Sequence, residues 1–175
     1  KPFSNVALYL TGSYNADDGV ARMLLEEHIE YEVVSINASQ ERINNFELII
    51  IPSSNTLSEE EIKKLKHFQN KGGALVVIGK GALNNKRDKF IFDLGAKYIG
   101  PSDFDMDYVQ VRKELSNNLV SSPFITYLPG IKSEANEDSS ILADIKVPYF
   151  SRTLEKYNGH LYAPNKLDKE NYPAV

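Results

Sequence analysis

Apolar positions in residues 46–78 form two runs, separated by a polar turn and a segment with helical periodicity. Phe46–Ile51 is apolar except at Glu47 and shows no alternation, as is typical of a strand buried on both faces. Ala74–Ile78 repeats the pattern and predicts a second buried strand. Two strands joined by a helix form a βαβ unit with parallel strands and a right-handed crossover. The stretch 47–81 is therefore predicted to organise a parallel sheet.

The segment between the two runs carries the signals of a capped helix. Ser58 and Glu61 have the S-x-x-E spacing of a capping box. Apolar side chains recur at helical spacing at Ile62, Leu65 and Phe68. Glycine commonly ends a helix in the left-handed conformation, so we expect Gly72 or Gly73 to do so.

The residues before this unit predict more of the same sheet. In chain order we expect a strand at 5–10, a helix at 17–30, a strand at 31–36 and a short helical segment at 42–46. Asn15 or Asp17 is expected to cap the first helix. The order βαβ(α)βαβ predicts an α/β fold with a flavodoxin-like, doubly wound, mainly parallel sheet between helical layers.

The second half of the chain loses this regularity and reads as β-rich. Its predicted elements are a short helix at 88–94 and strands at 96–99, 107–111, 123–127, 131–135 and 141–146. We expect residues 1–175 to form a single domain, with a parallel core at 1–100 and a β-rich extension at 101–175. Residues 171–175 resemble the entry to a further strand, which suggests truncation at the C-terminus.

Composition narrows the chemistry. The 175 residues include no cysteine, which excludes thiol catalysis, disulfides and cysteine-based metal sites. A net charge of -4 offers no electrostatic footprint for nucleic acid, and no apolar run is long enough to span a bilayer. We expect neither nucleic acid nor membrane as a partner, and slightly favour the bacterial cytoplasm over the periplasm or exterior.

Ligands of doubly wound folds gather at the carboxyl ends of the strands. The loops predicted there contribute a set of polar candidates for binding a sugar or another small molecule: Ser13, Tyr14, Asn15, Asp17, Asp18, Ser53, Ser54, Asn55 and Lys80. A flavin is disfavoured, because Asp17 and Asp18 would repel its phosphate at the helix start. A phosphorelay receiver is excluded, because Pro52 and Ser53 stand where an aspartate is required.

No catalytic or metal-binding constellation is evident. Amidotransferases and hydrolases carry a strained Cys or Ser between strand and helix, whereas Gly79-Lys80-Gly81 follows the strand here. An independent hydrolase would have to use Ser53 or Ser54, which lack a G-x-S-x-G setting. His28, His67 and His160 are scattered, so we expect no metal and no cofactor.

Two clusters have both structural and functional interpretations. Asp103, Asp105 and Asp107 alternate, which favours a solvated strand edge over a calcium site. An aromatic and basic cluster late in the chain suits a pocket or subunit interface as well as a packed loop: Tyr149, Arg152, Tyr157 and His160. Asn37-Ala38-Ser39 matches a glycosylation sequon, which matters only in a eukaryotic secretory context.

These residues resemble a known family, the glutamine-amidotransferase-like domain of multidomain glycoside hydrolases, and in particular the β-galactosidase trimerisation domain. The resemblance lies in a strand ending at Leu10, Asp17-Asp18-Gly19, ELIIIP at 47–52, LSEEEI at 57–62, GGALVV at 72–77, VPYFSRT at 147–153, His160 and NYPAV at 171–175.

The resemblance implies a non-catalytic domain that resembles an amidotransferase without its nucleophile. Its implied partners are the catalytic TIM-barrel domain of the parent chain and further copies in a homo-oligomer. The implied role is to shape assembly or the substrate cleft, and a further strand and helix are expected after Val175. A ligand-binding module at the strand ends is the alternative.

Overall fold

A computed structural model describes residues 3–53, 57–117, 119–157, 159–167 and 171–174. The chain divides into two compact units, Lys1–Leu94 and Gly95–Val175. The prediction that residues 1–175 make up one domain stays a prediction. Each unit is described by itself.

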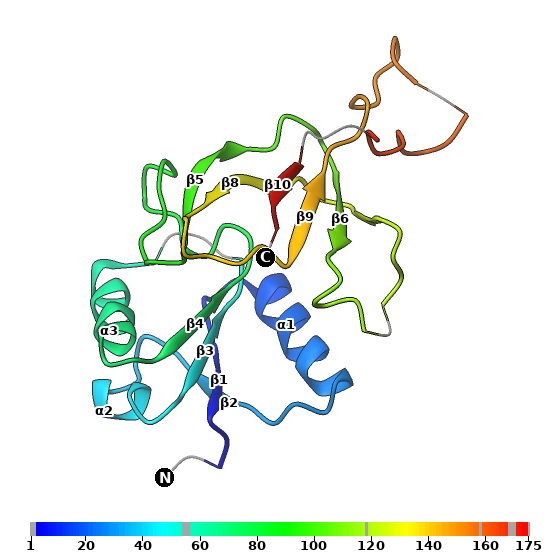
Figure 1. Ribbon diagram of the computed structural model, residues 1–175. Coiled ribbons are helices and arrows are strands. Elements are labelled where there is room, and N and C mark those ends of the chain that lie inside the picture. Colours follow the sequence, from blue (N-terminus) through cyan, green and yellow to red (C-terminus); the bar gives the residue numbers. More distant parts are fainter. Residues whose placement is uncertain (1–2, 54–56, 118, 158, 168–170, 175) are drawn as a thin grey trace. The chain divides into compact units, whose positions relative to one another are not determined.

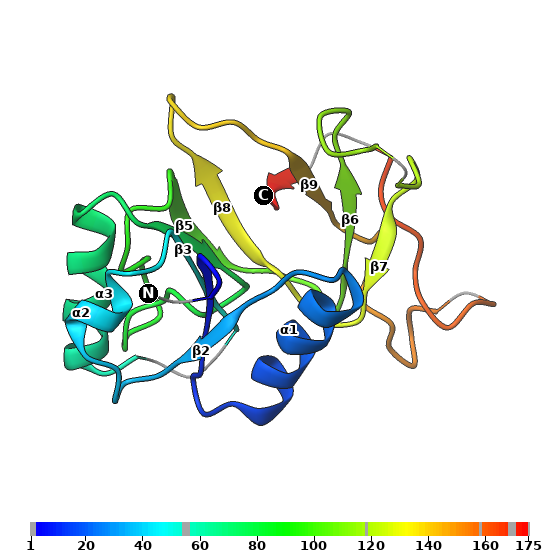
Figure 2. The same cartoon turned by 90° about the horizontal axis from the view of Figure 1, so that it is seen from below.

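The N-terminal unit is a parallel sheet between two helical layers (Figure 1). Its elements are β1 (Val6–Tyr9), α1 (Tyr14–Glu26), β2 (Glu32–Val34), α2 (Gln40–Ile43), β3 (Leu48–Ile51), α3 (Glu59–Asn70) and β4 (Ala74–Val77). The strand order is β2-β1-β3-β4, and every pairing is parallel. Helix α1 covers one face, and α2 and α3 cover the other (Figures 1 and 2). The predicted doubly wound α/β fold is confirmed.

Two apolar clusters hold the layers together, one on each face of the sheet. On the α3 side, Tyr9, Ile49 and Ile51 pack with Leu65 and Phe68. On the α1 side the cluster is smaller and consists of Leu8, Val20, Leu24 and Ile50. Burial of one such side chain stabilises the fold by about 1.5–3 kcal/mol. Because successive side chains of β3 point to opposite faces and are all apolar, this strand contributes to both clusters.

The predicted ends of α3 are confirmed. The Ser58 side chain accepts a hydrogen bond from the Glu61 N–H, and the Glu61 side chain accepts one from the Ser58 N–H, so the capping box is complete. At the other end Gly72 has a φ of 90°. Gly73 lies against Phe68, where a Cβ would overlap the ring.

Helix α1 differs from its prediction at both ends. It begins at Tyr14, its N-cap is Ser13, and neither Asn15 nor Asp17 caps it. It stops at Glu26 because His28 adopts a left-handed φ of 56°. The His28 N–H bonds to the Leu25 carbonyl and the Ile29 N–H to the Leu24 carbonyl, which is the Schellman pattern with histidine in place of glycine.

Strand β4 and the segment after it also correct the sequence prediction. β4 is an edge strand, and its residues alternate between exposed and partly buried, so it is not a second fully buried strand. No helix forms at 88–94. Leu83 and Phe90 form a β-bridge, and the Asn84 side chain bonds to both the carboxylate and the N–H of Asp88, which stabilises a turn instead.

The second unit is antiparallel, which confirms the β-rich prediction. Its strands are β5 (Ala96–Pro101), β6 (Asp107–Val111), β7 (Phe124–Thr126), β8 (Ile131–Ala135), β9 (Ala143–Lys146) and β10 (Asn171–Pro173). They form one sheet of order β10-β9-β6-β7 and a two-stranded sheet of β5 and β8. Among the described residues, no helix has the length and apolar character to cross a membrane.

Candidate functional site

The β1–α1 loop is organised by a buried carboxylate. Asp17 is 8% exposed and accepts hydrogen bonds from the Thr11 hydroxyl at 2.7 Å and from the N–H groups of Thr11 and Gly12, each at 3.1 Å. The left-handed Gly12, with a φ of 80°, lets the chain turn tightly enough to present these donors. Asp17 therefore folds the loop, and its oxygens are committed to the protein itself.

A groove lies beside this loop, between α1 and β2. It has a volume of about 390 Å³ and is lined by Leu8, Leu10, Gly12, Tyr14, Asp17, Asp18, Ala21, Tyr31 and Val33. Tyr14 is 78% exposed, and Asp18 pairs with Arg22 at 2.8 Å. Tyr14, Asp17 and Asp18 are the predicted binding residues that this groove brings together.

The loops after β3 and β4 pack against each other. The Lys80 N–H donates to the Ser53 hydroxyl at 3.2 Å. A Cβ on Gly79 would lie 2.9 Å from that hydroxyl oxygen, and a Cβ on Gly81 would overlap the Pro52 carbonyl oxygen. This tight packing occupies the point after a parallel strand where amidotransferases and hydrolases with a nucleophile elbow carry their nucleophile. The Lys80 side chain is exposed, and Ser54 and Asn55 lie outside the described residues.

The predicted binding residues thus fall into two sets within the described part of the chain. One set surrounds the start of α1 and includes Asp17, and the other pairs Ser53 with Lys80. No hydrogen bond or ion pair between described residues joins Ser13, Tyr14 or Asn15 to Ser53 or Lys80. Their joint action on a ligand stays a prediction.

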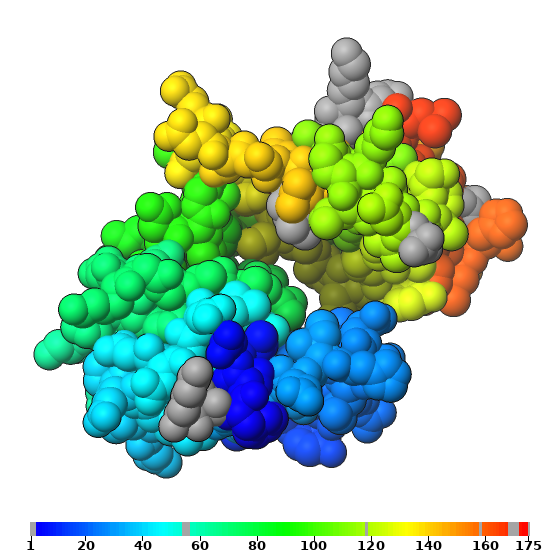
Figure 3. All heavy atoms as spheres, turned by 60° about the horizontal axis from the view of Figure 1, so that its bottom comes forward, coloured from blue at the N-terminus to red at the C-terminus, as the bar shows by residue number. Residues whose placement is uncertain are grey.

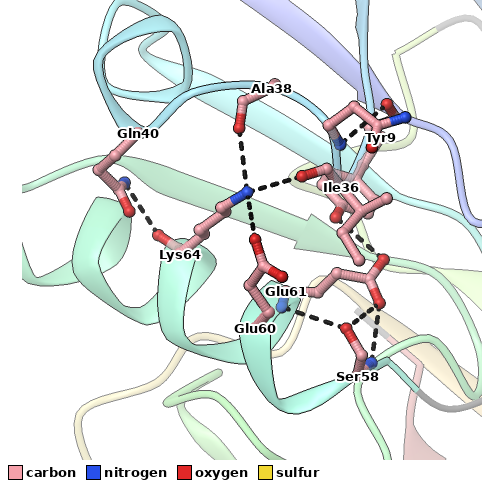
Figure 4. A network of polar contacts seen from close by, with 10 residues as sticks. Tyr9, Ile36, Ala38, Gln40, Ser58, Glu60, Glu61 and Lys64 are labelled. Carbon is pink, nitrogen blue, oxygen red and sulfur yellow. Dashed lines mark hydrogen bonds and ion pairs between the residues drawn. The ribbon is translucent and has the colours of Figure 1, made fainter.

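A polar network that sequence reasoning missed joins three elements of the N-terminal unit (Figure 4). The buried Tyr9 hydroxyl of β1 donates to Glu61 Oε1 at 3.0 Å, and the other carboxylate oxygen, Oε2, accepts from the N–H and hydroxyl of Ser58. Burial and then the negative charge of Glu61 raise the pKa of the Tyr9 hydroxyl above its usual value. The tyrosine therefore stays protonated and serves as a donor.

Lys64 extends this network to the loop after β2. Its ammonium donates to the Ile36 carbonyl at 2.6 Å and the Ala38 carbonyl at 3.2 Å, and it pairs with Glu60 at 2.8 Å. The same contact with Lys64 lowers the pKa of Glu60. Figure 4 shows the lysine reaching between α3 and this loop. The only signal in the sequence was the i, i+4 spacing of Glu60 and Lys64.

Asp107 contradicts the prediction of a solvated strand edge. Its side chain is 1% exposed, and it accepts hydrogen bonds from the Gly130 N–H at 2.7 Å and the Ser102 hydroxyl at 3.0 Å. Burial raises the pKa of its carboxyl, although these two hydrogen bonds oppose the shift. Asp103 and Asp105 precede β6, and Asp103 binds Lys132 at 2.9 Å. The three acids therefore share no common face.

The aromatic and basic cluster lies in the loop after β9. The Arg152 guanidinium donates to the Leu161 carbonyl at 3.2 Å, which braces the loop, and the Tyr149 N–H bonds to the Pro164 carbonyl. Tyr149 and Tyr157 are 48% and 68% exposed, and His160 is exposed. Sequence reasoning missed the contact of Tyr162 with Tyr127, whose ring centroids are 5.5 Å apart. The interface or pocket role of this cluster stays a prediction.

Potential metal ligands do not cluster in the described part of the chain, where no group of three or more His, Asp or Glu side chains could hold an ion. Of the three histidines, His28 ends α1, His67 lies exposed in the last turn of α3, and His160 lies in the loop after β9.

Comparisons with known proteins agree with this geometry. The family model described as "GLMA-like, second domain" matches residues 7–90. The α-L-fucosidase isoenzyme 2 from Paenibacillus thiaminolyticus superposes with a TM-score of 0.85 at 24% identity, over 95% of this chain and 26% of that chain. Gan42B, a GH42 β-galactosidase from an organism given only as G., superposes with a TM-score of 0.60 at 16% identity, over 87% of this chain and 25% of that chain.

A third solved structure is the exo-β-1,4-mannosidase Op5Man5 from Opitutaceae bacterium strain TAV5, with a TM-score of 0.55 at 15% identity, over 80% of this chain and 27% of that chain. The chain spans about a quarter of the length of all three structures. At these identities the likeness shows the fold. No curated protein sequence matches the chain. The family-model match over residues 7–90 agrees with the resemblance to the amidotransferase-like domain of the β-galactosidase trimerisation type that the sequence indicated, and over most of its length the chain shares its fold with a part of each of these glycosidases.

Proposed function

We propose that this chain is a non-catalytic accessory domain of a larger glycoside hydrolase, where it shapes assembly or the substrate cleft. The observation that carries the proposal is the packing after β4. Gly81 lies so close to the Pro52 carbonyl that even a Cβ would clash, and Ser53 accepts the Lys80 N–H. A nucleophile elbow requires an exposed side chain at this point.

The partners of the proposed domain are a catalytic TIM-barrel domain in the same chain and further copies of the protein in a homo-oligomer. Support comes from the glycosidases with which the fold is shared, because the shared part makes up only about a quarter of each of them. These partners, and the bacterial cytoplasm as compartment, rest on resemblance. The fold comparisons and the committed oxygens of Asp17 favour this role over a module that binds a small ligand at the strand ends.

Hydrolysis of chromogenic substrates tests the lack of catalysis. The purified chain is expected to hydrolyse nitrophenyl β-galactoside, α-fucoside, β-mannoside and acetate no faster than buffer alone does. A fluorophosphonate probe, which labels activated serines, is expected to leave Ser53 unmodified. Turnover above buffer that disappears in Ser53→Ala or Lys80→Ala would overturn the proposal. Tyr14→Phe is the matched control, because it changes an exposed side chain at the start of α1 and leaves the loops after β3 and β4 intact.

A further inference from the structure

Two exposed tyrosine rings meet in the second unit. The ring centroids of Tyr127, in the turn after β7, and Tyr162, in the loop after β9, are 5.5 Å apart, and the ring planes are tilted by 57°. Tyr127 is 68% exposed and Tyr162 is 39% exposed, so the contact leaves most of the Tyr127 side chain in solvent. In Figures 2 and 3 the orange loop after β9 lies beside the yellow-green segment that carries β7. We call these two rings the tyrosine platform.

The backbone on both sides of Tyr127 is held against β6. The Thr126 hydroxyl lies within hydrogen-bond distance of two carbonyl oxygens, that of Asp107 at 3.0 Å and that of Leu128 at 3.2 Å. Beyond the ring, the Gly130 N–H donates to the buried Asp107 carboxylate at 2.7 Å. The turn that presents Tyr127 is therefore fixed from within its own unit.

The backbone on both sides of Tyr162 is held in a similar way. The carbonyl of the preceding residue, Leu161, accepts a hydrogen bond from the Arg152 guanidinium at 3.2 Å. The carbonyl of the following residue, Ala163, accepts one from the Tyr108 hydroxyl at 2.8 Å. Side chains on a fixed backbone lose little conformational freedom when a ligand binds, so less of the contact energy is spent on ordering them.

The area of the platform favours a small ligand over a protein. A tyrosine side chain that is covered completely buries about 150–250 Å². Both rings are already partly covered, so the pair offers much less than the roughly 800 Å² per partner that a specific protein interface buries. A pyranose is a six-membered ring of about the size of the tyrosine ring, so the platform matches the footprint of a short oligosaccharide.

Tyrosine supplies both kinds of contact that a pyranose requires. The face of an aromatic ring carries partial negative charge. A pyranose has a face of C–H bonds whose hydrogens are polarised positive by the neighbouring oxygens, so this face is attracted to the aromatic ring. Its hydroxyl groups project from the ring edge, where a phenol hydroxyl can donate and accept hydrogen bonds. The hydroxyls of Tyr127 and Tyr162 make no hydrogen bond to a described residue and are free for this role.

We propose that the tyrosine platform binds neutral pyranose oligosaccharides, with a sugar ring stacked on Tyr127 and Tyr162 bordering it. This inference rests on the proposed place of the chain in a glycoside hydrolase and names the ligand that the domain contacts. The platform belongs to the second unit, so it is distinct from the strand-end loops of the N-terminal unit that Asp17 organises.

Saturation-transfer-difference NMR on the purified chain tests the proposal, with β-1,4-galactotetraose and β-1,4-mannotetraose as probes. A contact through so few rings is expected to give a dissociation constant on the order of 1 mM. Saturation is expected to be strongest at the C–H hydrogens of one pyranose face. Galactitol, which has the hydroxyl groups of galactose but no closed ring, is expected to show no saturation transfer.

Substitutions separate stacking from other contacts. Tyr127→Ala and Tyr162→Ala are each expected to weaken binding by about tenfold or more, whereas Tyr127→Phe keeps the ring face and is expected to stay within about threefold of wild type. The matched control is Tyr157→Ala, because Tyr157 lies in the same unit, is also 68% exposed and makes no ring contact with a described residue. It is expected to bind as wild type does. Thermal unfolding checks that each variant is folded.

Absence of saturation transfer from the wild-type chain to both tetraoses overturns the inference, and so does undiminished binding by Tyr127→Ala. Binding that is lost in Tyr14→Ala and kept in Tyr127→Ala would place the sugar at the strand ends instead. Self-association of the wild-type chain in sedimentation velocity that Tyr127→Ala abolishes would identify a protein contact, which also contradicts the inference. None of these results alters the outcome of the hydrolysis and labelling tests, so failure of this site is distinguishable from failure of the proposed accessory function.

Discussion

The hydroxyl of Tyr9 and the carboxylate of Glu61 meet at 3.0 Å, which joins the central strand β1 to the first turn of α3. Tyr9 is fully buried, and Glu61 also receives the N–H and hydroxyl of Ser58. The contact couples a core side chain to a helix cap, two features that are usually treated separately. Both partners lie on the face of the sheet that α2 and α3 cover.

Replacing Tyr9 with Phe is expected to lower the free energy of unfolding by about 1–3 kcal/mol, because a hydrogen bond to a charged group is lost from a buried site. Urea denaturation of the purified chain measures this loss. Tyr14→Phe serves as the control, since Tyr14 is 78% exposed, and its effect is expected to stay within about 0.5 kcal/mol. Equal effects of the two substitutions would contradict a stabilising role for the Tyr9–Glu61 bond.

Replacing His28 with Gly is expected to stabilise the chain by about 0.5–1 kcal/mol. A side chain in the left-handed conformation costs more than glycine's added freedom in the unfolded chain. The reciprocal change, Gly72→Ala at a φ of 90°, is expected to destabilise by about 1 kcal/mol. Thermal unfolding measures both changes: the midpoint is expected to rise for His28→Gly and to fall for Gly72→Ala. A destabilised His28→Gly would show that its imidazole makes a contact worth more than the backbone strain.

Replacing Gly81 with Ala is expected to destabilise the N-terminal unit by about 1–3 kcal/mol, because the new methyl group overlaps the Pro52 carbonyl oxygen. The contrasting change is Gly19→Ala in α1, where a Cβ meets no atom within 4 Å. Alanine there is expected to stabilise by about 0.5–1 kcal/mol, since glycine is the poorer helix former. Denaturant midpoints of the two variants should move in opposite directions. A Gly81→Ala variant as stable as the wild type would mean that the loops after β3 and β4 can move apart at little cost in free energy.

Asp107 is expected to make stability depend on pH. Burial raises its pKa in the folded state, so the folded chain binds the proton more tightly than the unfolded chain does. Its contribution to stability is therefore full below the ordinary pKa of 3.8, and it falls as pH rises from there through the raised value.

Asp107→Asn removes this titration and keeps an acceptor for the Gly130 N–H. The difference in unfolding free energy between this variant and the wild type is expected to move in favour of the variant as pH rises through that window. Asp107→Ala leaves the Gly130 N–H without its acceptor and is expected to lose about 1–3 kcal/mol. A pH-independent difference between Asp107→Asn and the wild type would contradict a raised pKa.

The elements that local pattern alone specifies were predicted well. The unbroken apolar run of β3 and the Ser58–Glu61 capping box with its closing Gly72 depend on neighbours within a few residues, and the structure confirms them. The end of α1 was missed because a left-handed histidine carries no signal comparable to glycine. The helix expected at 88–94 was wrong because Asn84 and Asp88 compete for the backbone through their side chains.

By itself the sequence determined the parallel α/β layout, the β-rich second half and the missing nucleophile, because hydrophobic period, capping spacing and residue identity are local properties. Only the tertiary structure decided that β4 is an edge strand, that Asp107 is buried while Asp103 is not, and that Tyr9 meets Glu61. Strand order, burial and long-range hydrogen bonds depend on which distant segments pack together. That pairing follows from the summed free energy of the whole fold, to which no short stretch of sequence gives access.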